Sequence, residues 1–303
     1  MSKILLILRW LLTRVAVLIL IWCLILPQLV NFKTINDRLK VRRLNDNRPN
    51  FSSLVAFSQG RGDVSPQEWR HYQDYFRLVL KYIPDDPVAE GFLGFMYLQT
   101  KNEAQAIALL EKSAFKAPLF FWSDYNLGVY YYRQGNFKLA AQHLQNAVNV
   151  PVTSLVSVMM SSIIYRQIFV SSNFKSSVAK QVQQAYQDAY VLLLASLDAL
   201  GMSEASVSLS LRALKDKFNQ QDSLYYYSGL GFFKMRQYDK ALFFFNKSME
   251  MANKEPWSYF WIAKLFEING DQEKAAEYIK AFTLLKGAQQ LLPYDQRMSF
   301  RVF

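Results

Sequence analysis

The chain has 303 residues, 51% of them apolar and 16% aromatic, with 35 basic and 24 acidic side chains. This composition excludes a disordered protein, because it provides enough apolar surface for a large core. One cysteine and two histidines exclude an internal disulfide and a zinc site, while the formal charge of +11 predicts an anionic partner, either nucleic acid or a membrane surface.

An uncharged apolar segment near the N-terminus predicts a membrane anchor. Residues 15–32 carry no charged side chain and are long enough, as a helix, to cross the hydrocarbon core of a bilayer. Residues 1–14, with three basic and no acidic side chains, are expected to lie at the interface. A cleaved signal peptide is disfavoured, since no small residues mark a cleavage site after Leu26. A buried core helix is disfavoured because the segment has no polar face.

The basic excess is concentrated around this segment. Residues 1–50 carry nine basic and two acidic side chains, and residues 33–52 form a juxtamembrane basic linker that would meet lipid head groups. The positive-inside rule, applied to the linker alone, places the following domain in the cytoplasm. The positively charged N-terminal tail is, however, costly to translocate. We therefore expect a single-pass protein of the bacterial inner membrane with its domain outside the cytoplasm.

A pattern with a period of 34 residues follows. Equivalent residues lie 34 apart, as do Gly94 and Gly128, and likewise Ala241 and Ala275. Such a period predicts stacked helical hairpins, with small residues where two helices approach closely and large residues filling the space around them. The pattern covers residues 87–120, 121–154, 222–255 and 256–289.

These segments resemble the tetratricopeptide repeat (TPR) family in the spacing of their small and large residues. The resemblance implies a TPR array over residues 53–289, followed by a tail at residues 290–303. Residues 53–86 are interpreted as a degenerate repeat, and residues 155–221 as two degenerate hairpins or an insert of similar size. The predicted fold class is therefore all-α, a TPR-type helical-hairpin solenoid preceded by a single N-terminal transmembrane helix.

The resemblance also implies a concave groove lined by the first helix of each hairpin. The side chains expected there are mostly aromatic or aliphatic, which predicts binding of an apolar helix or an extended segment of a protein partner. Two alternatives remain open: the same side chains pack within the array, or the groove is occluded by the chain's own N- or C-terminal segment. The predicted groove residues are Phe95, Leu98, Trp122, Tyr125, Val129, Tyr132, Tyr226, Leu230, Phe233, Trp257 and Phe260.

Two polar residues lie near the predicted groove. Some TPR proteins hold a carboxylate with paired Lys and Asn side chains, and only Asn126 and Lys264 approach that pattern, each without a partner residue. In the apolar groove, substitution of Trp122 and Tyr125 by alanine is expected to abolish partner capture without unfolding the array.

No catalytic, cofactor-binding or metal-binding motif appears in the sequence. His71 and His143 lie far apart in helical patterns, with His143 expected at the surface, and Cys23 lies inside the predicted membrane span. From residue 87 onward, 22 basic and 17 acidic side chains are interleaved, which argues against a nucleic-acid footprint.

These observations predict a membrane-anchored TPR scaffold or adaptor without enzymatic activity. It would bind protein partners through its groove and membrane lipid through its anchor and basic flanks, in the assembly of a membrane or envelope complex. An obligate structural subunit of a larger membrane complex is the alternative, and an enzyme is disfavoured.

Overall fold

The computed structural model describes residues 39–301 apart from residues 59, 171–177, 217–220, 253–255, 290–292 and 298. The chain divides into two units, Met1–Pro49 and Asn50–Phe303, and in the first of these residues 39–46 are helical. The predicted anchor at residues 15–32 lies outside the described residues. Within the described part of the chain, no helix combines the length and the apolar character that a membrane crossing requires.

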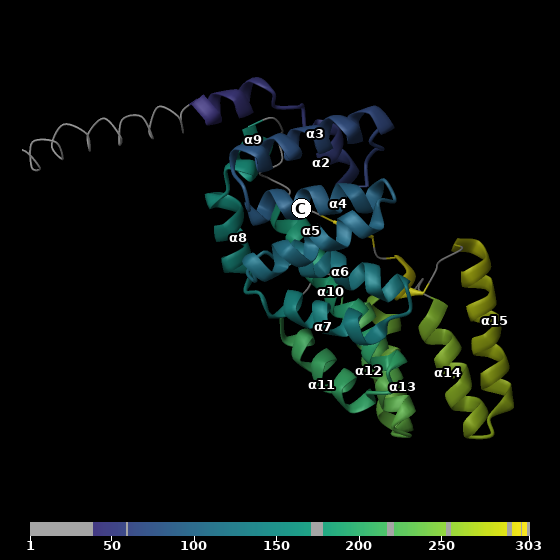
Figure 1. The fold of residues 1–303 in the computed structure, drawn as a ribbon. Helices are drawn as coiled ribbons and strands as arrows, with labels where there is room; N and C mark the ends of the chain where they lie inside the picture. Colours follow the sequence, from purple (N-terminus) through teal and green to yellow (C-terminus); the bar gives the residue numbers. More distant parts are fainter. Residues whose placement is uncertain are drawn as a thin grey trace, which may run out of the picture. The chain divides into compact units, whose positions relative to one another are not determined.

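The second unit is an all-α repeat structure, as predicted, with helices and short 3-10 turns as its regular elements in the described residues. Four helical hairpins occupy the four segments in which the repeat pattern is clearest (Figure 1). They are α4 (Pro87–Gln99) with α5 (Glu103–Lys116), α6 (Phe121–Arg133) with α7 (Phe137–Asn149), α12 (Asp222–Lys234) with α13 (Tyr238–Met251), and α14 (Pro256–Ile268) with α15 (Gln272–Gln289).

The turns inside these hairpins follow from local residue chemistry. Gly135 and Gly270 have φ angles of +72° and +80°, a left-handed conformation that glycine adopts without steric cost. The next residues, Asn136 and Asp271, begin the second helices, since each side chain accepts a hydrogen bond from the backbone N–H three positions later, at 3.2 and 3.1 Å. The glycine ends one helix and the polar residue starts the next.

Small residues let the two helices of a hairpin approach closely. A methyl group added to Gly94 would lie 2.8 Å from Cγ of Leu110, and one added to Gly229 would lie 2.7 Å from the ring of Phe245. Gly128 makes an equally close approach to its facing helix. The predicted pairing of small and large residues is therefore the actual contact between the helices.

Buried serine pairs join one hairpin to the next. The hydroxyls of Ser113 and Ser123 lie 2.7 Å apart between α5 and α6, and those of Ser248 and Ser258 lie 2.9 Å apart between α13 and α14. All four residues are fully buried. Each pair satisfies two hydroxyls that would otherwise be costly to bury, and so permits close packing at the junction.

Residues 155–221 contribute one hairpin to the stack and one pair of short helices beside it. The long helix α10 (Val178–Ala199) packs on α7, and α11 (Ser203–Ala213), which is followed by η2 (Leu214–Asp216), packs on α12. The short helices α8 (Val152–Ser161) and α9 (Ile163–Val170) precede them. Tyr165 of α9 is fully buried, with its ring 5.3 Å from that of Phe92 in α4. This region therefore combines an insert with a repeat-like hairpin.

The helices ahead of the first clear repeat differ from a regular hairpin. The helix α2 (Ser52–Ser58) has only seven residues, and α3 (Pro66–Tyr82) has seventeen. Gly60 has a φ of +65° and lies in the turn between α2 and α3. The rings of Phe76 in α3 and Phe92 in α4 stack 5.0 Å apart, which joins α3 to the array.

Candidate functional site

The predicted groove contains the chain's own C-terminal tail, defined here as residues 293–297 and 299–301. This segment includes η3 (Tyr294–Arg297) and follows α15. In Figure 1 the orange and yellow segment after α15 leaves the last hairpin and passes toward α6. Its residues contact α12 first and then α6 and α10, so the tail runs back along the array. Of the alternatives that the sequence left open, occlusion by the chain's own C-terminal segment is realised in this structure.

The tail begins with an aromatic anchor at α12. The ring of Tyr294 lies 5.2 Å from the ring of Tyr226, and its hydroxyl donates a hydrogen bond to the Asp222 carboxylate at 2.8 Å. Tyr294 is only 5% exposed, which makes it the most deeply buried side chain of the tail among those described. Its ring and hydroxyl therefore fix the start of the tail on the array.

The carboxylate of Asp295 is held by two phenols from separate repeats. Tyr132 of α6 donates to it at 2.7 Å and Tyr227 of α12 at 3.3 Å. Burial, assisted by the neighbouring Asp295 carboxylate, raises the pKa of both tyrosines above the ordinary value of 10. Both phenols therefore remain protonated donors at neutral pH, aimed at one acceptor.

The last described residues of the tail are held through their main chain. The hydroxyl of Tyr125 donates to the carbonyl oxygen of Ser299 at 2.9 Å. The side-chain amide of Asn126 donates from Nδ2 to the carbonyl oxygen of Arg301 at 2.6 Å, and its Oδ1 accepts from the Arg301 N–H at 2.9 Å. These contacts recognise an extended main chain and do not depend on the side chain it carries.

The guanidinium of Arg301 forms a buried ion pair. Its Nη2 lies 2.7 Å from Oδ2 of Asp188 in α10, a residue whose side chain is only 3% exposed. Burial raises the pKa of the Asp188 carboxyl, and the Arg301 charge together with the amide of Gln184 opposes this shift. Because a buried carboxylate needs a cationic partner, Asp188 favours an arginine at this point of the groove.

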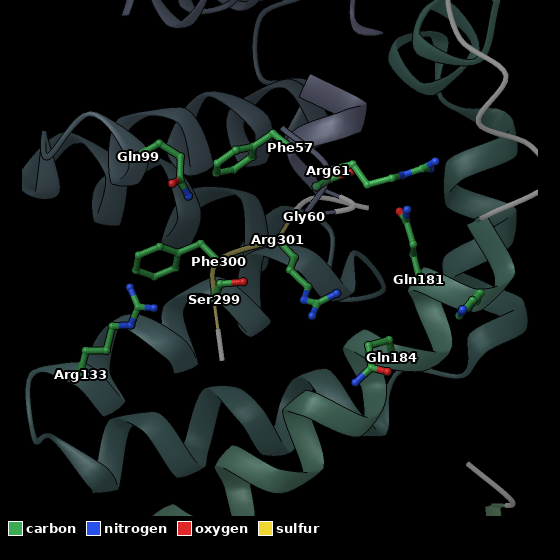
Figure 2. Close-up of a pocket in the computed structure, with 12 residues that line it drawn as sticks. Phe57, Gly60, Arg61, Gln99, Arg133, Gln181, Gln184, Ser299, Phe300 and Arg301 are labelled. Atoms are coloured by element: carbon green, nitrogen blue, oxygen red, sulfur yellow. The ribbon is translucent and has the colours of Figure 1, made fainter. Parts of the chain in front are cut away.

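A cavity of about 740 Å³ adjoins the end of the described tail (Figure 2). Figure 2 shows Phe300 and Arg301 between Arg133 and Gln184 on one side and Arg61 on the other. The guanidinium of Arg133 lies 4.6 Å from the centre of the Phe300 ring, a cation–π contact. The charged side chains that line the cavity are all basic: Arg61, Arg133, Lys180 and Arg301.

The predicted groove residues fall into three groups. Tyr125, Tyr132 and Tyr226 contact the tail. A second group is buried by packing within the array, as the ring of Phe95 shows by lying 6.1 Å from that of Trp69 in α3. This second group comprises Phe95, Leu98, Trp122, Val129 and Leu230.

The third group lies in the last hairpins and is partly exposed. The rings of Trp257 and Phe260 lie 5.5 and 5.3 Å from Phe282 of α15, and the ring of Phe233 lies 5.0 Å from that of Trp261. These aromatic side chains pair with side chains of their own or the neighbouring hairpin. The alternative of packing within the array therefore describes this part of the predicted groove.

The burial of Trp122 and Tyr125 overturns one expectation drawn from the sequence. Trp122 is 1% exposed and Tyr125 is fully buried. Truncation of a buried aromatic side chain to alanine costs about 3–5 kcal/mol. The double alanine substitution would therefore destabilise the array, and it cannot serve as a clean test of binding.

Several polar residues of the site were missed or undervalued from the sequence. Asn126 was noted as lacking a partner residue, but its partner is a main chain, which no side-chain pattern reveals. Tyr227 and Asp188 gave no signal, because their role depends on where the tail lies. His143 is partly buried, with a side chain that is 16% exposed and an Nδ1 that lies 2.8 Å from the Asp124 carboxylate. Over the described residues, no group of three or more His, Cys, Asp or Glu side chains could hold a metal ion.

Comparison with known proteins identifies the fold. No protein-family model and no curated protein matches the sequence. Among solved structures, PilF of Pseudomonas aeruginosa matches with a TM-score of 0.50 and 15% sequence identity, covering 86% of this chain and 97% of the other. The crystal structure of MamA matches with a TM-score of 0.48 and 18% identity, covering 65% of this chain and 96% of the other. The likeness to PilF shows the fold, which is that of the tetratricopeptide-repeat proteins.

Proposed function

We propose that this tetratricopeptide-type array is a membrane-anchored scaffold that holds an extended segment of a partner protein in the groove occupied here by its tail. The observation that carries the proposal is the grip of Asn126 on the main chain of Arg301, at 2.6 and 2.9 Å. A main-chain contact of this kind can be made equally with a segment of another protein. Together with Tyr125, Asn126 forms a general site for an extended chain.

The anchor is the part of the proposal that rests on sequence. The uncharged stretch at residues 15–32 and its basic flanks support insertion into the inner membrane. The positively charged N-terminal tail, which is costly to translocate, supports an array outside the cytoplasm. Confinement to a membrane raises the effective concentration of partners held there. This supports a role in the assembly of a membrane or envelope complex.

Photocrosslinking in native membranes tests the proposal. A photoreactive amino acid placed at Tyr132, a half-buried predicted groove residue that contacts the tail, should crosslink to a partner protein. The matched control is Phe243, a 55% exposed residue of the second helix α13, which should give no such product. Equal products at both positions, or none at either, would contradict a groove-directed scaffold.

The anchor requires a separate test. The full-length chain should remain in the membrane pellet after alkaline carbonate extraction, and the array should be digested by protease added from the periplasmic side. Release of the intact chain by carbonate would contradict the anchor. Protection of the array in intact spheroplasts would place it in the cytoplasm.

An obligate subunit is the second candidate function, and one surface feature favours it. Phe115 at the end of α5 is 88% exposed and Leu119 is 48% exposed, and both line an open cavity of about 430 Å³. Exposed aromatic side chains beside a hollow are typical of surfaces that a partner covers. Under this hypothesis, Phe115→Ser should release the chain from a large detergent-solubilised complex while leaving its own fold intact.

A further inference from the structure

We infer that the tail is a built-in competitor for the groove and that it mimics the partner, a segment that carries a carboxylate side chain and, six residues later, an arginine. This inference rests on the proposed function and deepens it. Residues Asp295 and Arg301 of the tail define the spacing. The groove recognises their side chains at two separate points, a hydrogen-bond acceptor at the first and a cation at the second.

The first point accepts only an anion or another hydrogen-bond acceptor. Tyr132 and Tyr227 come from repeats far apart in the sequence, and both donate to the Asp295 carboxylate. Two phenols that converge on one position would be left without an acceptor by an apolar occupant. The occupant of this position therefore carries a carboxylate or an equivalent acceptor.

The second point requires a cation. The Asp188 side chain is 3% exposed, and its carboxylate pairs with Arg301 at 2.7 Å. An occupant without a cation would leave this acid buried and unpaired, at a large cost. Tyr125 holds the main chain at Ser299, between the two points, and Asn126 holds it at Arg301 itself.

The tail lies on the array as a ligand does and not as a core element. Among its described residues Tyr294 is the buried side chain, whereas Asp295, Gln296, Ser299, Phe300 and Arg301 are at least partly exposed. Its contacts with the array include hydrogen bonds, one ion pair and the ring contact of Tyr294 with Tyr226. A partner must displace it, so the apparent affinity of the partner is reduced by the fraction of chains in which the tail is bound.

A peptide added in trans tests the inference on the full-length chain in detergent. The probe is a fluorescent peptide with the sequence of residues 293–301. The tested chain carries Asp295→Ala and Arg301→Ala, which weaken the tail and leave the groove unaltered. We expect this chain to bind the peptide at least about tenfold more tightly than the unsubstituted chain. A peptide with alanine at the two corresponding positions should bind neither chain.

Two controls separate this result from loss of structure. Gln296→Ala, at an exposed tail residue, should leave peptide binding as it is in the unsubstituted chain. Added peptide should raise the melting temperature of the chain with the two tail substitutions. A chain that melts far lower and binds no peptide would show the tail to be a fixed part of the fold, which overturns the inference. An unsubstituted chain that is dimeric, and becomes monomeric on substitution of the tail, would show exchange of tails between copies and would also overturn it.

Failure of the inference and failure of the proposed function give different results. If the peptide does not bind but crosslinking at Tyr132 still captures a partner, the tail is not a mimic and the scaffold proposal stands. If the peptide binds but no partner is crosslinked in membranes, the groove has no partner in the cell and the scaffold proposal fails.

Discussion

The side-chain amide of Asn126 forms two hydrogen bonds with the main chain of Arg301. It donates to the carbonyl oxygen at 2.6 Å and accepts from the N–H at 2.9 Å. The two residues are 175 positions apart in the sequence. This relationship turns the first helix of one repeat into a receptor for an extended chain. The described part of the tail therefore lies where a partner would bind.

Asn126→Ala should loosen the end of the tail. The substitution removes two hydrogen bonds, each worth about 0.5–1.5 kcal/mol, and the main chain of the partly exposed Arg301 can bond to water instead. We expect faster hydrogen exchange at the Arg301 amide with little change in the exchange of the helices. Gln142→Ala, at an exposed position of α7, is the matched control and should change neither. Unchanged protection of the Arg301 amide in the Asn126→Ala chain would contradict the role assigned to Asn126.

The phenols that hold Asp295 should ionise at a higher pH than ordinary tyrosines. Because the pKa of Tyr132 and Tyr227 is raised in the folded chain, their ionisation opposes folding, and stability should fall as the pH rises above about 10. The Asp295→Asn chain lacks the neighbouring charge, so its tyrosines should ionise at lower pH. Spectrophotometric titration of tyrosinate measures both effects. Coincident titration curves for the two chains would argue against the contact.

Gly128→Ala should destabilise the array, although alanine is the better helix former. The added methyl group would collide with Leu144 on the facing helix, and overpacking of this kind costs about 1–3 kcal/mol. Gly287→Ala is the matched control, since no atom lies within 4 Å of its added methyl, and there the change should stabilise the helix by about 0.5–1 kcal/mol. Chemical denaturation gives both values. If both substitutions changed the stability in the same direction, the close approach of the helices at Gly128 would not require glycine.

Trp122→Ala should cost about 3–5 kcal/mol, because the side chain is 1% exposed and its removal leaves a cavity. Phe115→Ala, at a residue that is 88% exposed, should change stability by no more than about 0.5 kcal/mol. Thermal or denaturant unfolding of the two variants makes the comparison. A small effect at Trp122 would restore it as a candidate binding residue.

The repeat was predictable from the sequence because its signals are local and periodic. Gly128 with Leu144 and Gly229 with Phe245 occupy positions fixed by helix geometry, and Gly135 and Gly270 mark turns that their own conformational freedom permits. Every hairpin packs its two helices in the same way, so the same residue types recur every 34 residues. This periodic pattern determined the all-α repeat and the helices expected to line the groove.

The place of the tail was decided only by the tertiary structure. A short segment with no periodic pattern carries no local signal for where it lies, and its contacts link Asp295 to Tyr132 and Arg301 to Asn126 across 163 and 175 residues. The same applies to residues 155–221, where packing on α7 and α12 decided that α10 and α11 continue the stack. The sequence determined the helices that line the groove, and long-range contacts determined what fills it. Asn126 binds an extended main chain and Asp188 binds a single charge. Both contacts depend on residues that meet only after the array has folded.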